Sequence, residues 1–161
     1  MHLHVIGIGG IGISALARYY LDLGYTISGS DSHDSTLIHT LRSEGMSISI
    51  GHQDYHLPDT TDLVIYSEAI ITQPDLPPEE QIYANRELAH ARNLGIPHFS
   101  YPVALAQVFD THRGIAIAGS HGKSTTTAMT ATMLLGSEID FSVIVGTQVP
   151  QLGGMNFYRQ D

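Results

Sequence analysis

The chain has no cysteine and few basic residues, and both scarcities limit its chemistry. Without cysteine it can form neither a disulfide nor a thiolate nucleophile, a composition compatible with the cytoplasm. Seven Lys and Arg residues against sixteen Asp and Glu residues give a formal net charge of −9, which argues against DNA or RNA as a partner. A nucleotide can still bind to so acidic a protein, because loop amides and helix N-termini set the local field.

Long hydrophobic runs are also missing. No apolar stretch approaches the ~20 residues that a membrane-spanning helix needs. The chain passes from Met1 directly into a strand-like segment without a basic leader, so we expect no secretory signal. Its 161 residues, 42% of them hydrophobic, are typical of a globular α/β protein with one full domain and the start of another.

The first motif is a glycine loop near the N-terminus. A short apolar strand over residues 3–8 leads into G-x-G-x-x-G at Gly7, Gly9 and Gly12. A helix over 11–23 and a second strand over 25–30 follow, and the second strand ends at Asp31, where dinucleotide-binding folds keep a ribose-binding acid. Strand, loop, helix and acid together predict a site for a nucleotide or a nucleotide sugar.

Helical and strand patterns continue to alternate up to about residue 112. We expect helices at 32–44, 79–93 and 101–109, and strands at 47–50, 62–66 and near 98. The segment Ser67-Glu68-Ala69-Ile70 follows one of these strands, at the edge where open parallel sheets bind ligands. Residues 1–112 therefore read as a Rossmann-like, doubly wound α/β domain with a parallel sheet.

A second glycine loop begins a second unit, residues 113–161. An apolar strand is expected at 115–118, then the turn Gly119-Ser120-His121-Gly122, then a helix opened by Lys123-Ser124-Thr125. Such a loop cradles phosphates, because its amides and the helix N-terminus are positive, the lysine reaches the outer phosphates and the serine hydroxyl binds Mg²⁺. Lys123 is the only lysine of the chain, and Ile117 stands where the longer form of this motif has glycine.

The second unit contains little else that is regular. One further strand is expected at 141–145, followed by a glycine-rich tail. So short a unit cannot cover both faces of a parallel sheet, and we therefore expect the chain to be the front of a longer protein. It begins a phosphate-loop α/β domain.

His52 and His56, among ten histidines, stand at the i, i+4 spacing of a metal-binding pair. They lie in a polar, proline-flanked stretch without an evident third ligand, which favours solvated loop histidines.

Two glycine loops more than a hundred residues apart imply two phosphate-bearing ligands. The combination suggests an enzyme that uses ATP on a substrate carrying a nucleotide diphosphate. A dinucleotide-binding oxidoreductase or sensor domain is one alternative, although it leaves Lys123 unexplained. A non-catalytic regulator that keeps only the sugar-binding fold is another.

Six sequence blocks resemble the Mur ligase family, within it the UDP-N-acetylmuramate:L-alanine ligase branch. They are GIGGIGISALA at 7–17, SGSD at 28–31, IGH at 50–52, SEAI at 67–70, AGSHGKSTTT at 118–127 and VGTQVPQLGGMNF at 145–157. The related ligase that recycles the muramyl tripeptide shares most of them. The resemblance covers nearly the whole chain and implies a cytoplasmic, ATP- and Mg²⁺-dependent ligase of peptidoglycan precursor synthesis.

The resemblance also implies residue roles in the first domain. The diphosphate of the UDP-sugar would lie against Gly9, Gly10, Ile11 and Gly12, and its ribose or uracil near Ser30 and Asp31. Further contacts to this ligand would come from Ser67, Ala69 and Ile70. Glu68 replaces the serine usual in the family, and because a carboxylate there would repel a phosphate we expect it to point away from the ligand. His52 would either line the uridine side or have a structural role in its loop.

In the second unit ATP would lie against Gly119, Ser120, His121, Gly122, Lys123, Ser124 and Thr125. Lys123 would neutralise the β- and γ-phosphates, and Ser124 with help from Thr125 would hold Mg²⁺; His121 could pack the loop or contact ATP. Related ligases phosphorylate the lactyl carboxylate, and the amine of L-alanine attacks the resulting acyl phosphate. The second Mg²⁺-binding acid and the closing domain of such ligases match no residue here, so we expect the 161-residue chain to bind the UDP-sugar without turnover.

Overall fold

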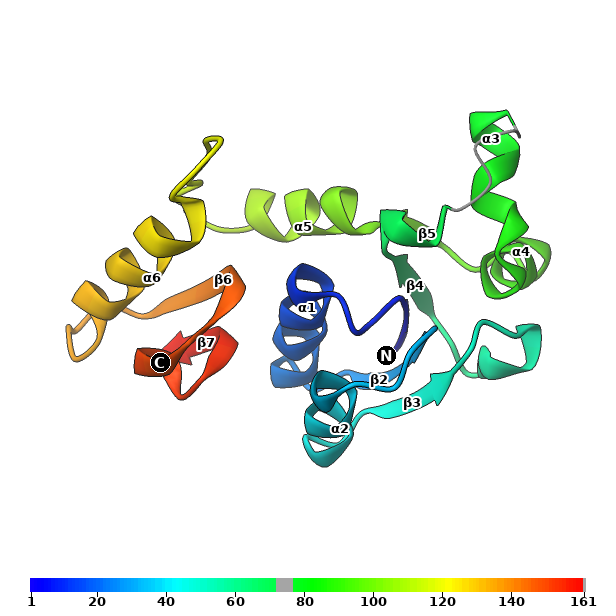
Figure 1. Ribbon diagram of the computed structural model, residues 1–161, viewed down its shortest axis with the longest axis horizontal. Helices are drawn as coiled ribbons and strands as arrows, with labels where there is room; N and C mark the ends of the chain where they lie inside the picture. Colours follow the sequence, from blue (N-terminus) through cyan, green and yellow to red (C-terminus); the bar gives the residue numbers. More distant parts are fainter. Residues whose placement is uncertain (72–76, 161) are drawn as a thin grey trace.

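Five short parallel strands form the central sheet of the first unit (Figure 1). The computed structural model describes residues 1–71 and 77–160. The strands are β1 (His2–Ile6), β2 (Thr26–Asp31), β3 (Ser47–Ile50), β4 (Leu63–Tyr66) and β5 (His98–Ser100). Their order is β3-β2-β1-β4-β5, with every neighbouring pair parallel. This is a Rossmann-like arrangement, and the predicted fold class is confirmed.

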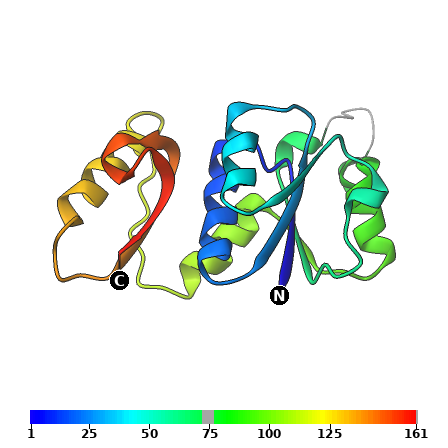
Figure 2. The same cartoon turned by 90° about the horizontal axis from the view of Figure 1, so that it is seen from below.

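Helices cover both faces of the sheet (Figure 2). On one face lie α1 (Ile11–Asp22), α2 (Thr36–Ser43) and α5 (Tyr101–Asp110), and on the other lies α4 (Arg86–Asn93). A short α3 (Pro78–Gln81) precedes α4, and single 3₁₀ turns occur at Asp54–His56, Glu68–Ile70 and Ile82–Ala84. None of the helices in the described part of the chain is long and apolar enough to cross a membrane.

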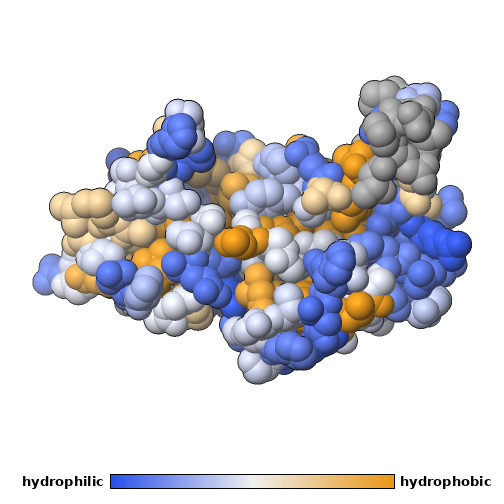
Figure 3. Space-filling view, viewed as in Figure 1, coloured by the Kyte–Doolittle hydropathy of each residue, from blue (hydrophilic) through white to orange (hydrophobic). Residues whose placement is uncertain are grey.

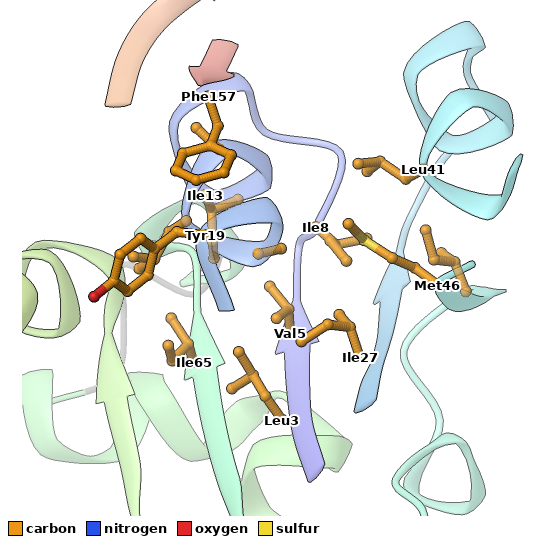
Figure 4. Packing of buried hydrophobic residues seen from close by; sticks show 14 of the residues in the cluster. Leu3, Val5, Ile8, Ile13, Tyr19, Ile27, Leu41, Met46, Ile65 and Phe157 are labelled. Atoms are coloured by element: carbon orange, nitrogen blue, oxygen red, sulfur yellow. The ribbon is translucent and has the colours of Figure 1, made fainter. Parts of the chain in front are cut away.

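The alternation of side chains along β1 explains why both faces are apolar. Leu3 and Val5 pack with Ile65 of β4 in the larger core under α1 and α5 (Figure 4). Ile6 points the other way, into a smaller core that includes Leu88 of α4. A strand of a parallel sheet is buried on both sides, and its residues are therefore nearly all apolar.

Two predicted helices differ from the observed ones, in both cases at a capping residue. The helix expected at 32–44 begins only at Thr36, because the Ser35 side chain accepts a hydrogen bond from the Ile38 amide (3.3 Å) and caps it. The helix expected at 79–93 is broken, since Asn85 caps α4 by accepting from the Leu88 amide at 3.1 Å. Short polar side chains favour such caps over helix interiors.

The second unit consists of α6 (Lys123–Leu134) and an antiparallel hairpin of β6 (Phe141–Val149) and β7 (Met155–Gln160). The strand expected at 141–145 is confirmed within β6, whereas β7 lies where only a glycine-rich tail was expected. The strand expected at 115–118 is wrong. Within residues 1–71 and 77–160 no strand pairs with this segment, and Ile115 is 78% exposed. An apolar run without a neighbour cannot complete a hydrogen-bonded ladder.

The hairpin packs against α1, so the second unit is anchored to the helix that starts at the first glycine loop (Figure 1). Asn156 of β7 is fully buried, and its Nδ2 donates to the Ile11 carbonyl (2.6 Å) and to Ser14 Oγ (3.0 Å). Arg18 of α1 donates to Asn156 Oδ1 and also to both carboxylate oxygens of Glu44 (2.8 and 2.7 Å). These buried polar groups satisfy one another, which fixes the hairpin on α1.

Candidate functional site

A cleft of about 420 Å³ lies at the carboxyl edge of the parallel sheet, where the loops after β1 and β4 diverge. Such a topological switch point is where open α/β sheets bind their ligands. The loops after β1, β2, β3 and β4 and the start of α4 contribute its lining residues, Gly7, Gly10, Asp31, Ser32, His52, Ser67, Ala69, Ile70, Ala84, Asn85 and Arg86.

Each glycine of the G-x-G-x-x-G loop occupies a position where a larger side chain would collide with a neighbour. Gly7 has a φ of +78°, and a Cβ there would lie 2.9 Å from the Ser67 Cβ. A Cβ on Gly9 would lie 2.7 Å from Asp31 Oδ2, and a Cβ on Gly12 would lie 2.7 Å from the Tyr101 hydroxyl oxygen. The loop therefore turns tightly, approaches β2 and lets α1 pack closely on α5.

The N-terminus of α1 opens beside the cleft with its first amides uncapped. Gly10 is the N-cap residue, and no side chain in the described chain caps the helix. No acidic residue stands in its first turn. Uncapped amides and the positive end of the helix dipole make this a favourable place for an anion such as a diphosphate.

Asp31 connects the cleft to the glycine loop. Its Oδ2 accepts from the Gly9 amide at 2.8 Å, and its Oδ1 accepts from the His33 amide at 3.1 Å. The carboxylate thereby holds the loop, and it still lines the cleft with free acceptor capacity.

The loop after β4 forms the opposite wall. The Ser67 amide donates to the Ile6 carbonyl (2.9 Å), and the Ser67 hydroxyl accepts from the Ala69 amide (3.3 Å). These bonds turn the chain so that Ala69 and Ile70 line the cleft. Glu68 is exposed and is not among the lining residues.

The structure brings together most of the residues that the resemblance assigned to the sugar nucleotide. Gly10, Asp31, Ser67, Ala69 and Ile70 line the cleft. Gly9, Ile11 and Gly12 flank it in the glycine loop and the first turn of α1, with Ile11 50% exposed.

Ser30 is the exception, because its side chain is fully buried behind the cleft. Its hydroxyl donates to the Glu87 carboxylate, and its carbonyl accepts from the Gly7 and Ile8 amides at 2.8 and 3.1 Å. Ser30 thus supports the glycine loop instead of facing the cleft.

Glu87 of α4 is a buried carboxylate that sequence reasoning missed. It is 0% exposed, with His52 Nδ1 3.4 Å from its Oε2, His56 Nδ1 3.6 Å from its Oε1 and His4 Nε2 3.9 Å from its Oε1. Burial alone would raise the pKa of this carboxyl, but the neighbouring His4 and His52 rings and the hydrogen bond from Ser30 outweigh burial and hold the pKa below its usual value.

His52 and His56 are consequently not solvated loop histidines, and that interpretation is wrong. Their side chains are only 22% and 13% exposed, because both pack around the Glu87 carboxylate. The described residues contain no group of three or more His, Cys, Asp or Glu side chains with the geometry of a metal site.

Arg86 also lines the cleft and was missed by sequence reasoning. It is exposed, and its guanidinium donates to Gln53 Oε1 at 3.1 Å. It is the only cationic side chain among the lining residues named above, which supplies a positive charge for an anionic ligand. Arg86 was not recognised as a lining residue because an unbroken helix was expected across this position.

The second glycine loop lies at the start of α6. Gly122 has a φ of +78° and is the N-cap, and Lys123 Nζ donates to the carbonyls of Gly119 (2.5 Å) and Ser120 (3.3 Å). His121 is exposed, with its Nδ1 3.3 Å from Ser120 Oγ. The ammonium is therefore held inside the loop by its own carbonyls.

Ser124 and Thr125 line a second hollow, of about 570 Å³, between α6 and the end of β6. Met129 and Met133 extend its wall and are 62% and 83% exposed. The space-filling view shows mixed tan and orange apolar surface at this α6 end of the molecule (Figure 3).

Comparison with known proteins places this architecture in one family. The model of the Mur ligase family, catalytic domain, matches residues 2–113. A UDP-N-acetylmuramate–L-alanine ligase of Campylobacter jejuni is 42% identical over 159 residues, 99% of this chain and 33% of the relative. The corresponding ligase of Alkaliphilus metalliredigens is 39% identical over 95% of this chain and 31% of its own length. The chain thus spans about a third of the length of the curated relatives it matches.

Solved structures of similar ligases share this fold. A UDP-N-acetylmuramate-alanine ligase from Thermotoga maritima superposes with a TM-score of 0.83 at 28% identity, over 98% of this chain and 34% of that one. A murein peptide ligase from Psychrobacter arcticus superposes with a TM-score of 0.79 at 27% identity, over 100% of this chain and 34% of that one.

Proposed function

This chain belongs to the Mur ligase family, and we propose that it carries the UDP-sugar site and the ATP phosphate loop of a UDP-N-acetylmuramate:L-alanine ligase. The observation that carries this proposal is the cleft at the switch point, where uncapped α1 amides, Arg86 and the Ser67 loop converge. Residues 1–112 would form the UDP-sugar domain, and residues 113–161 would begin the ATP domain.

In this proposal the diphosphate of UDP-N-acetylmuramate lies against the first turn of α1. The amides of Ile11 and Gly12 donate to the phosphate oxygens, and the Arg86 guanidinium neutralises part of their charge. Ser67 and Ala69 contact the ligand from the β4 side, and Asp31 offers its remaining lone pairs to ribose hydroxyls.

The second site would bind ATP. Lys123 leaves the carbonyls of Gly119 and Ser120 to reach the β- and γ-phosphates, and the hydroxyls of Ser124 and Thr125 suit Mg²⁺, which prefers oxygen ligands. When bound, Mg²⁺ neutralises phosphate charge during transfer. The lactyl carboxylate attacks the γ-phosphorus, ADP leaves, and the amine of L-alanine displaces phosphate from the acyl phosphate to form the amide.

We expect the 161-residue chain to bind without turning over, because Lys123 and the surrounding loop lie on an open surface. Phosphoryl transfer depends on enclosing and aligning both reactants. A ligase that joins UDP-N-acetylmuramate to a tripeptide is the second candidate, supported by the TM-score of 0.79 to the murein peptide ligase, which is below the 0.83 to the alanine ligase.

Calorimetric titration with UDP-N-acetylmuramate tests the proposal, with UDP and NADH as comparison ligands. We expect saturable binding of the UDP-sugar, weaker binding of UDP and no response to NADH. Binding of NADH without binding of the UDP-sugar would assign the first glycine loop to a dinucleotide-binding oxidoreductase or sensor and would overturn the proposal.

A further inference from the structure

A hydrogen-bonded chain of three side chains runs from the interior to the cleft: Glu87, Ser30 and His52. Glu87 and Ser30 are 0% exposed, whereas His52 lines the cleft. A buried carboxylate is costly unless hydrogen bonds stabilise its charge. Here the Ser30 hydroxyl donates to Glu87 Oε2, and the His52 and His4 rings lie 3.4 and 3.9 Å from the carboxylate; they lower the pKa of Glu87 and keep it ionised at neutral pH, although burial opposes this.

The ionised carboxylate determines the direction of both hydrogen bonds that link Glu87, Ser30 and His52. A carboxylate can only accept, so the single proton of the Ser30 hydroxyl points to Glu87 Oε2. Ser30 Oγ must then accept from His52 Nδ1, which lies 2.9 Å away. The direct approach of His52 Nδ1 to Glu87 Oε2, at 3.4 Å, favours the same placement of the proton.

The proton on Nδ1 leaves Nε2 of the neutral imidazole with a lone pair. Nε2 of His52 forms no hydrogen bond in the described part of the chain. It is also not one of the buried side-chain atoms without a partner, so it remains accessible. Because Nδ1 points to Ser30 and the ring lines the cleft, Nε2 is the polar atom of His52 that a ligand can reach.

We propose that Glu87, acting through Ser30, is a positioning residue that presents His52 Nε2 as a hydrogen-bond acceptor for a donor on the bound nucleotide. This inference rests on the proposed function. The donor is the imide N3–H of uracil or a hydroxyl of the ribose. If it is the imide, the same contact excludes cytosine, whose N3 carries a lone pair and would face the lone pair of Nε2. Sites built around one hydrogen bond discriminate well against analogues that lack it.

The tautomer of His52 is the first readout, and it needs no ligand. Nitrogen-15 NMR of the histidine rings at about pH 8, where an ordinary imidazole is neutral, should show His52 protonated on Nδ1. The variant Glu87→Gln should lose this preference. An amide can donate to Ser30, whose hydroxyl can then donate to His52 Nδ1, so the hydrogen bonds can run in the opposite direction. The variant Glu138→Gln, at an exposed position before β6, is the matched control. A proton on His52 Nε2 in the unchanged protein would overturn the inference.

Ligand analogues supply the second readout. UDP should bind about 10-fold more tightly than N3-methyl-UDP if the donor is the imide, or than 2′-deoxy- or 3′-deoxy-UDP if it is a hydroxyl. In Glu87→Gln the ratio of the affinity for UDP to the affinity for the analogue should approach one. If that variant does not fold, Ser30→Ala removes the linking hydroxyl with a smaller change. It should reduce the ratio, because only the longer 3.4 Å approach of His52 Nδ1 to Glu87 Oε2 then remains.

The outcomes separate the two proposals. If UDP binds and every analogue binds within twofold of it, the inference is overturned while the proposed function stands. If UDP-N-acetylmuramate and UDP do not bind, the proposed function falls, and the ligand part of the inference falls with it. A structural role for Glu87 alone would lower stability without changing the ratio between analogues.

Discussion

Replacing Gly9 by alanine is expected to weaken the binding of UDP-N-acetylmuramate by about 100-fold, close to 3 kcal/mol. The added Cβ would lie 2.7 Å from Asp31 Oδ2 and 3.1 Å from Asp31 Cγ, so the carboxylate must move. Its displacement breaks the hydrogen bonds to the Gly9 and His33 amides, which hold the loop. Gly9 does not have a positive φ, so the effect comes from this collision and not from backbone strain.

Calorimetry measures the loss, and Gly146→Ala is the matched control. Among residues 1–71 and 77–160, a Cβ on Gly146 would meet only Ser124 Oγ, at an ordinary 3.7 Å, in the second unit. This variant should bind the UDP-sugar within twofold of the unchanged protein, and thermal unfolding should show that both variants are folded. Unaltered binding by Gly9→Ala would mean that the ligand does not lie against the first glycine loop.

Replacing Lys123 by alanine is expected to reduce the affinity for Mg²⁺·ATP by on the order of 10-fold or more. Lys123 is the only lysine of the chain, and its ammonium is held at the loop by the carbonyls of Gly119 and Ser120. No other described side chain places a primary ammonium at this loop. Binding of the UDP-sugar should not change, because Lys123 does not line the first cleft.

Titration with ATP in the presence of Mg²⁺ measures this effect, with Arg113→Ala as control. Arg113 is an exposed cation that precedes the loop, so its removal changes the net charge equally without touching the cradle. A similar loss of ATP affinity in both variants would show that only general charge matters. The loop at 119–125 would then not be a specific phosphate site.

The parallel strands and the loops that line the cleft could be predicted because their signals are local. Short apolar runs mark most of the parallel strands, and the glycines at 7, 9 and 12 mark the turn at the switch point. The carboxyl ends of parallel strands meet at one edge, so the sequence could place both the glycine loop and the loop after β4 at the ligand-binding edge, whereas the pairing of β4 with β1 came only from the structure.

Features that depend on distant partners could not be predicted. Glu87 stands in a polar helix and looks solvent-exposed, yet side chains from β1, β2 and the loop after β3 enclose it. The segment at 115–118 has the composition of a strand, but no neighbouring strand supplies its ladder in the described chain. The strand β7 was not predicted, because Gly153 and Gly154 made its segment look like an irregular tail. The two glycines instead lie in the turn of the hairpin in which β7 pairs with β6.

Amide NMR mapping of the UDP-N-acetylmuramate site tests the central claim most directly. Adding the UDP-sugar to the nitrogen-15-labelled chain should shift the amides of Gly10, Gly12, Ser67 and Ile70 most, while the amide of Lys123 stays in place. That result would locate the ligand in the cleft between the loops after β1 and β4. Large shifts confined to residues 119–125, with the glycine loop at 7–12 unmoved, would contradict the account.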